Sequence, residues 1–343
     1  MEDFLYRLEF KGPVHFGTIG IGLEKTLDYL PSDSLSSALI NAFAVLGTAD
    51  EVVRALRSDR PPFVLSSLFP FGPSQKENQR TYALPRPLTG PPVETPEVLR
   101  DLGRDLKRVR YLIPDDFFRW IGEKPLSGTE AEAVLAHSRE IGKGAENGSE
   151  AVWSATELRP RVALDRTSQN SSIWHCNVLH FHPSAGLYGL VRFLEQSWTA
   201  PLASAFRALG DLGLGGERTY GMGCFRFSGF EPVRTAWPTV PIEREDRLVL
   251  LSVFHPSSDE LTVLGERLVA WNFAESRGYV VSGRTPSTIK RKRLNMITEG
   301  SVFAKPVKGA LVDVTPDGAR ALGLPHSVYR SGLAFLLPGG AIQ

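Results

Sequence analysis

Residues 210–225 read GDLGLGGERTYGMGCF, and six of the first fourteen positions are glycine. An amphipathic helical pattern precedes the stretch and a strand-like pattern follows it. A Walker A loop would need a lysine, and a dinucleotide fingerprint would need a glycine where Arg218 stands and a helix after the loop. An ordinary helix end needs one or two glycines. We therefore expect a loop whose bare amides approach a ligand closely, with Arg218 able to fork onto a phosphate.

The segments around this loop predict a small α+β domain. Residues 3–12 alternate like a strand with one buried face, and residues 31–47 carry the start and stop signals of a helix. Residues 172–181 and 186–195 flank the turn HPSAG and predict a β-hairpin. With the helix at 198–213, the order is strand, helix, hairpin, helix, strand, which is a ferredoxin-like βαββαβ layout.

The rest of the chain divides into an insertion, a linker and a second block. The pattern weakens between 72 and 157, apart from a helix in PDDFFRWIG, which indicates a long insertion in a domain spanning 1–230. Residues 231–246 read as a linker. Strand patterns resume in 247–343, which we expect to form a second, smaller α+β domain.

Composition limits the classes of function. The 343 residues are 42% hydrophobic and carry a net charge of +1, as in a soluble globular protein without global attraction to nucleic acid. Any polyanion must therefore be held by local basic clusters. Neither a signal peptide nor a membrane span is recognisable, and two cysteines fit a reducing compartment. We expect a cytoplasmic protein.

One such cluster lies in GRTPSTIKRKR, at 283–293. It holds Arg284, Lys290, Arg291, Lys292 and Arg293 and no acid, and from Arg277 to Lys308 eight basic residues face the single acid Glu299. Such runs are usually solvated charges, and a local excess of this size also suits contact with a phosphate backbone. Both interpretations remain open at this point.

The histidines do not predict a metal site. His175 and His180 have opposite parity on a strand, and no carboxylate or cysteine pattern for zinc accompanies His180 and His182. His15, in the glycine-bearing loop after the first strand, suits a general base or a stacking platform, or is simply a loop histidine. Neither a nucleophile elbow nor a catalytic triad can be assembled, and no cofactor is expected.

Seven motifs occur in one order across nearly the whole chain: SDSLSSALINA, SSLFPF, PRVALDR, GLYGLVRF, GLGGERTYGMGCF, LLSVFHP and KRKRLNMITEGSVF. In this combination the sequence strongly resembles the family of fourth subunits of the Csm complex, the type III-A CRISPR effector of antiviral defence. That family belongs to the RAMP superfamily, and GLGGERTYGMGCF is similar to the glycine-rich loop of the superfamily.

The resemblance implies two ferredoxin-like, RRM-related domains and a subunit without catalytic activity. It implies binding of the 5′ handle of the CRISPR RNA (crRNA). The implied partners are the large palm-domain subunit that makes cyclic oligoadenylate and the backbone RAMP subunit, with target RNA nearby. It also implies a thumb-like hairpin that kinks the guide–target duplex, which we expect within 72–157.

Single-stranded RNA is bound by backbone amides, cationic side chains and stacking faces. In a ferredoxin-like fold the loops that carry such groups can converge at one end of the sheet, and we expect His15 and Arg218 to meet there. The expected RNA contacts are His15, Gly17, Lys25, Arg161, Arg166, Gly213, Gly215, Gly216, Arg218, Thr219, Tyr220, Gly221, Arg284, Lys290, Arg291, Lys292 and Arg293.

Three alternatives remain from the sequence. The first is a RAMP endoribonuclease that processes repeat RNA with His15 as general base, although no tyrosine or lysine partner for this residue is evident. The second is an adaptor that binds only protein. The third is the equivalent subunit of the type III-B complex, which shares the glycine-rich loop.

Overall fold

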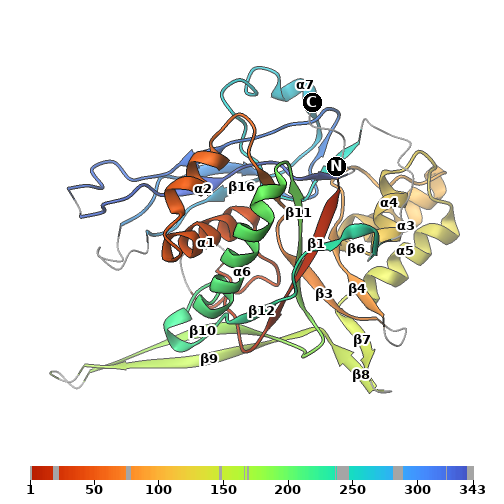
Figure 1. The fold of residues 1–343 in the computed structure, drawn as a ribbon. Helices are drawn as coiled ribbons and strands as arrows, with labels where there is room; N and C mark the ends of the chain where they lie inside the picture. Colours follow the sequence, from red (N-terminus) through yellow and green to blue (C-terminus); the bar gives the residue numbers. More distant parts are fainter. Residues whose placement is uncertain are drawn as a thin grey trace.

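The computed structural model describes residues 2–17, 23–74, 79–146, 149–165, 167, 170–235, 237, 247–280, 289–321 and 323–337. Figure 1 shows a central sheet with long helices against one face and a separate group of helices to one side. A long two-stranded hairpin projects from the body, and the C-terminal strands form a second layer beside the first domain.

The central sheet is antiparallel and runs in the order β12-β1-β11-β3-β4, with β13 beside β1 and β2 beside β11. Its strands are β1 (Asp3–Phe10), β2 (Phe63–Leu65), β3 (Phe69–Pro73), β4 (Arg80–Tyr82), β11 (Gly186–Phe193), β12 (Phe225–Phe227) and β13 (Glu231–Pro232). If β2 and β3 are counted as one strand, the four main positions follow the chain order fourth, first, third, second.

Strand β1 was predicted to bury one face, and the structure covers both. Leu5, Tyr6 and Leu8 are all fully buried, and Arg7 is nearly so. Tyr6 faces α6, whereas Arg7 on the opposite face bonds to the hydroxyl of Tyr82 and to Glu231. The buried arginine is tolerated because its charge is paired, so the period-two pattern understated how far the strand lies inside the protein.

The two helices on the sheet are those that the sequence predicts. Helix α1 (Ser32–Val45) follows Pro31 and ends before Gly47, whose φ is +81°. Helix α6 (Thr199–Leu212) buries its apolar face, and the ring of Phe206 lies 4.6 Å from that of Tyr6 in the sheet. The short helices α2 (Ala49–Leu56), η1 (Gln196–Trp198) and η3 (Val233–Thr235) complete this domain.

The weakly patterned insertion contains more helix than the sequence analysis predicts. The expected helix is present as α4 (Pro114–Ile121), and it is flanked by α3 (Pro96–Arg108) and α5 (Gly128–Glu140). Trp120 is fully buried within the main core. The insertion also holds short paired strands: β5 (Leu84–Pro85), β6 (Tyr111–Leu112), β7 (Lys143–Glu146) and β8 (Ser149–Val152).

The predicted pairing of 172–181 with 186–195 is wrong. Strand β10 (Ser171–Phe181) pairs with β9 (Ser154–Leu164) over eleven residue pairs, and β11 pairs with β1, β2 and β3. Every residue of β11 is buried, as expected for a central strand whose two faces are covered. Along its two edges β11 is hydrogen-bonded to β1 and to β2 and β3, so no edge is left for β10. The turn HPSAG therefore redirects the chain between two sheets.

The β9–β10 hairpin is the element that projects from the body in Figure 1. Its far part exposes apolar side chains on one face, where Val162 lies opposite Ile173 with exposed fractions of 54% and 64%. The helices at 96–140 instead pack into the body. The projecting hairpin thus begins at Ser154, near the end of the 72–157 segment in which a thumb was expected, and lies mostly beyond it.

The C-terminal part builds a second antiparallel sheet in the order β15-β18-β14-β21. Counted along the chain, this is again the order fourth, first, third, second when read from β21. Among the described residues its helix is the four-residue α7 (Leu264–Arg267). The remaining elements are β14 (Leu248–Leu250), β15 (Leu268–Ala270), β16 (Phe273–Ser276), β17 (Leu294–Ile297), β18 (Val302–Phe303), β19 (Leu311–Asp313), β20 (Tyr329–Ser331) and β21 (Leu336–Leu337).

The two sheets share a continuous interior. Val249, Leu251 and Phe335 of the C-terminal part belong to the same buried cluster as the first-domain core. Backbone bonds cross the junction as well, because the amide of Ser67 donates to the carbonyl of Leu251. This junction places helix α1 against β20, and it forms the walls of the cleft described next.

Candidate nucleic-acid interface

The glycine-rich loop leaves α6 through backbone conformations that disfavour other residues. Gly213, Gly215, Gly221 and Gly223 have φ values of +80°, +101°, +76° and +81°. A residue with a Cβ atom pays a steric cost in this region. The loop holds one short helix, η2 (Arg218–Tyr220), and returns to the sheet at β12.

Several of these glycines serve packing within the chain. The amide of Gly216 donates to the carbonyl of His15 at 2.8 Å, and the amide of Gly223 donates to that of Pro13 at 3.0 Å. A Cβ at Gly215 would lie 2.5 Å from the His15 oxygen, and one at Gly223 would lie 2.2 Å from the Leu214 oxygen. The loop therefore needs bare backbone partly to dock on the loop after β1.

His15 is 2% exposed, and its Nδ1 lies 2.8 Å from the carbonyl oxygen of Asn177 on β10. Its ring also approaches Gly216 and Gly17. The expected stacking platform or general base would need an accessible ring. In this structure the side chain instead joins the two glycine-bearing loops to the base of the hairpin.

The glycine-rich loop forms one wall of a cleft of about 460 Å³ between the two sheets. The first turns of α1 and the ends of β16, β17 and β20 form the other walls. Residues on these walls with polar side chains are Tyr29, Asp33, Ser34, Ser37, Asn41, Arg218, Glu275, Ser276, Arg277, Tyr279, Arg291, Thr298, Glu299 and Arg330. The volume falls in the range of about 300–1,000 Å³ that is usual for ligand sites.

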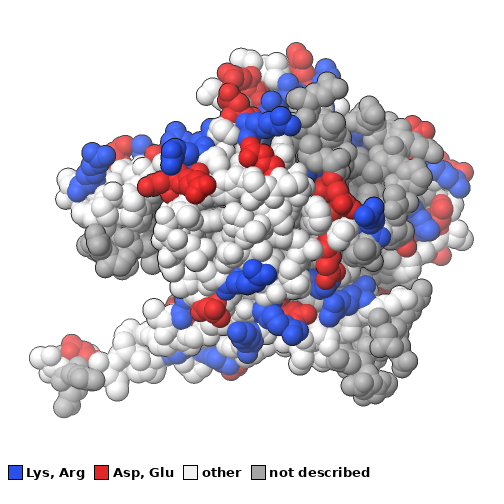
Figure 2. All heavy atoms as spheres, in the orientation of Figure 1, with Lys and Arg blue, Asp and Glu red and all other residues white. Residues whose placement is uncertain are grey.

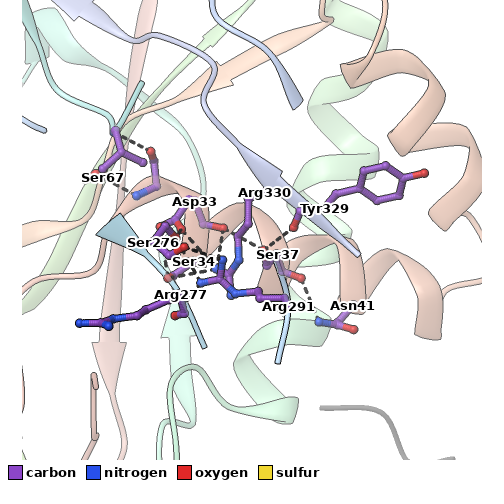
Figure 3. A network of polar contacts seen from close by, with 12 residues as sticks. Asp33, Ser34, Ser37, Asn41, Ser67, Ser276, Arg277, Arg291, Tyr329 and Arg330 are labelled. Atoms are coloured by element: carbon purple, nitrogen blue, oxygen red, sulfur yellow. Dashed lines mark hydrogen bonds and ion pairs between the residues drawn. The ribbon is translucent and has the colours of Figure 1, made fainter. Parts of the chain in front are cut away.

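Figure 3 shows the polar network at the floor of this cleft. Arg330 donates to the backbone oxygen of Asp33 and to the Oγ of Ser34, both at 3.3 Å, and it lies 3.5 Å from the Asp33 carboxylate. Ser276 Oγ donates to the same carboxylate at 2.6 Å. Arg291, in the segment before β17, donates to Ser276 Oγ at 3.1 Å, so helix α1 of the first domain is tied to β16, to β20 and to this segment of the second.

Two ionisable groups of the cleft are shifted by burial. Burial lowers the pKa of the Arg291 guanidinium to about 10, the positive charge of Arg330 adds to the decrease, and Asp33 opposes it. Burial also raises the pKa of the Glu299 carboxyl to about 7, although Ser67 Oγ donates to it at 2.5 Å. Both shifts reflect the cost of charge in a poorly hydrated site.

The basic run is largely paired with acids that the sequence segment lacks. Lys292 lies 2.8 Å from Asp317, which raises the lysine pKa, and Arg293 lies 3.4 Å from Glu275. Lys290 sits over the ring of Tyr279, with 5.9 Å between its ammonium and the ring centre. Arg284 lies outside the described residues. The local excess of positive charge in the folded protein is therefore smaller than the count of basic residues in the segment indicates.

A second group of expected residues meets where the outer half of the hairpin approaches the glycine-rich loop. The guanidinium of Arg161 lies 4.5 Å from the ring centre of Tyr220, which is 62% exposed. Trp174 is the cross-strand neighbour of Arg161, and Cys176 and Met222 pack together beneath this corner. An arginine plane beside exposed aromatic rings can stack an unpaired base.

The structure thus divides the expected RNA contacts. On the cleft wall lie Gly17, Gly213, Gly215, Gly216, Arg218 and Arg291. Thr219, Tyr220 and Gly221 are exposed on the loop, and Lys25 is exposed away from the cleft lining. Arg166 lies outside the described residues. In Figure 2 blue and red side chains mix over the visible face, and its centre is largely uncharged.

Sequence analysis missed Asp33, Ser276, Arg330 and Trp174. The serine-rich motif SDSLSS was visible at the start of α1, and it could have pointed to the network. Nothing local marked Arg330, because its partners on α1 are nearly three hundred positions away in the sequence. Among the described residues there is no cluster of potential metal ligands, and none of their helices is both long and apolar enough to span a bilayer.

Comparison with known proteins places the chain in a family. The model of the RAMP superfamily matches residues 7–226. The chain belongs to the RAMP superfamily. A second model, described as the CRISPR Csm4 C-terminal domain, matches residues 243–339 of this RAMP protein. The recognition of a type III-A, Csm4-like RAMP subunit from the sequence motifs is thereby confirmed.

Relatives of this RAMP protein carry the same description. It is 25% identical over 321 residues to the CRISPR system Cms protein Csm4 of Thermococcus onnurineus (strain NA1), covering 89% of this chain and 90% of the relative. It is 26% identical over 336 residues to the protein of that name from Mycobacterium tuberculosis (strain CDC 1551 / Oshkosh), covering 96% and 95%.

Solved structures share the fold of this RAMP protein. A chain from the Csm3–Csm4 subcomplex of the type III-A CRISPR-Cas interference complex matches with a TM-score of 0.57 at 16% identity, covering 99% of this chain and 100% of that one. A chain from the Csm1–Csm4 cassette in complex with pppApA matches with a TM-score of 0.55 at 22% identity, covering 98% and 97%.

Proposed function

We propose that this chain is a non-catalytic RNA-binding subunit of a type III-A CRISPR effector that holds the 5′ handle of crRNA. The observation that carries the proposal is the cleft between the two sheets. It brings the amide-rich glycine loop and Arg218 together with the arginines of the second domain. Arginine forks hold the phosphates of a single-stranded backbone, whereas most glycine amides of this loop are already bonded within the chain.

The proposed subunit consists of two domains, at 1–230 and 247–343, each ferredoxin-like, and β13 and η3 extend the first domain to Thr235. Strand order supports this division, because both antiparallel sheets follow the order fourth, first, third, second. Along the chain of the second domain, α7 comes between the first and second sheet strands, β14 and β15. The β19–β20 pair comes between the third and fourth, β18 and β21. The second domain thus keeps the sheet while its helical layer is reduced.

The proposed partners are the large palm-domain subunit and the backbone RAMP subunit, in the cytoplasm. Support comes from the fold neighbours, which come from a Csm1–Csm4 cassette and a Csm3–Csm4 subcomplex. The endoribonuclease alternative depended on His15 as a general base, and the ring of His15 is buried against Asn177. No observation favours that alternative.

The β9–β10 hairpin is proposed as the thumb-like element of this subunit. The exposed pair of Val162 and Ile173 would meet stacked bases, since apolar side chains can wedge between base steps. Replacing both with serine should leave handle binding unchanged and reduce unstacking of target RNA. Fluorescence of 2-aminopurine placed in the target strand measures that unstacking, and an unchanged signal would remove the thumb assignment.

The handle proposal is tested by binding of labelled crRNA to this chain together with its palm-domain partner. Arg218→Ala should weaken binding about tenfold or more, because a hydrogen bond to a charged group is lost. Arg100→Ala, on the exposed face of α3 and paired with Asp101, is the matched control. An RNA without the handle should bind as weakly as the variant; equal affinity of all four combinations would refute the proposal.

A further inference from the structure

Arg291 is the most deeply buried cation of the cleft. It is 6% exposed, and its Nη atoms donate to Ser276 O, Ser276 Oγ and Arg277 O at 2.8–3.2 Å. These acceptors are neutral, and the described residues place no carboxylate within ion-pair distance of Arg291. The carboxylate of Asp33 interacts instead with Arg330 and Ser276.

Two further arginines leave donors unused beside it. The Nε atoms of Arg277, Arg291 and Arg330 are all buried, and none has a hydrogen-bond partner among the described residues. All three residues line the cleft. Among the described residues, the acid paired with Arg277 is Glu275 at 3.8 Å, and Glu275 also lies 3.4 Å from Arg293.

Positive charge therefore exceeds negative charge at the floor of the cleft. Glu299 offsets it only in part near neutral pH, because burial raises its pKa to about 7 and its hydrogen-bond partner is Ser67. A buried cation without an anionic partner is costly, and an unsatisfied buried N–H adds to that cost. An anionic ligand that enters the cleft would relieve both costs.

A phosphate is the anion that fits these walls. An arginine presents Nε and Nη as a fork that matches two oxygens of one phosphate. Across the cleft stand Arg218 and the glycine-rich loop, and the beginning of α1, with Ser34 and Ser37, lines the side. The N-terminus of a fourteen-residue helix adds a favourable dipole for an anion.

We propose that one phosphodiester phosphate of the bound RNA lies on Arg277, Arg291 and Arg330 of the second domain, opposite Arg218 of the first. The inference rests on the proposed function and assigns the second domain a direct part in it. RNA in this position bridges both domains, so binding also stabilises their junction.

The test replaces single linkages of the handle by neutral methylphosphonates, one at a time. Affinity is measured for the wild type and for Arg291→Gln, each with the palm-domain partner. One linkage should weaken wild-type binding about tenfold when neutralised and should have no effect in the variant. The salt dependence of the variant should also be shallower by about 0.7 per lost phosphate contact.

Arg277→Gln provides a second variant, because its side chain is 38% exposed and its loss should not disturb folding. Arg277→Gln replaces Arg291→Gln in the experiment if circular dichroism shows that Arg291→Gln does not fold. Arg100→Gln is the control and should keep the wild-type linkage profile. If Arg218→Ala weakens binding while the Arg277 and Arg291 variants keep the wild-type linkage profile, this inference fails and the proposed function stands. If the wild type ignores the handle, both fail.

Discussion

The glycine-rich loop and the basic run at 289–293 make an instructive pair. The loop carries one arginine, Arg218, which is exposed on the wall of the cleft. The run carries four consecutive cations, but Lys292 and Arg293 are paired with Asp317 and Glu275. The fifth expected cation of that region, Arg284, lies outside the described residues.

The difference shows that the number of basic residues in a segment is a poor guide to anion binding. What matters is how many of those cations are not already paired with an acid. An exposed ion pair holds its cation beside an acid, although each partner remains hydrated. A buried arginine with neutral partners keeps its full attraction for an anion, because little water screens it. On this argument Arg218 and Arg291 matter for RNA more than the three exposed cations of the run.

The largest effect should come from the loop itself. Gly223→Ala should destabilise the protein by at least about 3 kcal/mol, because a positive φ alone costs about 1–2 kcal/mol and the new Cβ would collide with the Leu214 backbone. The matched control is Gly221→Ala, where φ is also positive but the Cβ meets open space. Urea unfolding of both variants measures the difference; equal losses would show that the close approach is irrelevant.

The single acid of the basic region should produce a pH effect. The folded-state pKa of Glu299 is about 7, against an ordinary 4.5. Its contribution is therefore fully present below pH 4.5, where both states are protonated, and it is lost as pH rises to 7. Relative to Glu299→Gln, the wild type should lose up to about 3 kcal/mol of stability across that window.

Denaturant unfolding of both proteins at several pH values between 4.5 and 8 measures this loss. The exposed Glu123→Gln variant is the control and should follow the wild type. A constant difference between the wild type and Glu299→Gln at all pH values would show that the carboxyl is ionised throughout, and that it offsets the arginines of the cleft after all.

The smallest effect should come from the exposed run. Lys292→Ala should change RNA affinity by less than about twofold, because its ammonium is already held by Asp317. Asp317→Ala should instead tighten binding slightly by releasing the lysine. The same crRNA binding assay measures both. A loss with Lys292→Ala as large as that with Arg218→Ala would reverse the comparison.

Much of the secondary structure was predictable because its signals are local. The proline and glycine that bound α1, and the apolar face of α6, lie within a few residues of the elements they define. Helix α5 was missed although its capping box, Ser127 with Glu130, is a visible local signal. The N-cap of α3, Thr95 followed by proline, is another.

Strand partners were harder, because they depend on how deeply each strand is buried. The turn at HPSAG fits a hairpin locally, and only the complete burial of β11 between β1 and β3 shows why β10 pairs elsewhere. His15 is a similar case. Its loop was identified correctly, but its burial depends on Asn177 and Gly216, which are distant in the sequence.

The sequence by itself determined the RAMP family, the main helices and the glycine-rich loop with Arg218, since motifs and periodicity act over short distances along the chain. Only the tertiary structure decided which cations are free. It pairs Lys292 with Asp317, buries Arg291 among the neutral acceptors of Ser276 and Arg277, and brings Arg330 to the start of α1. Electrostatic energy depends on separation in space and on hydration, and neither can be read from positions along a chain.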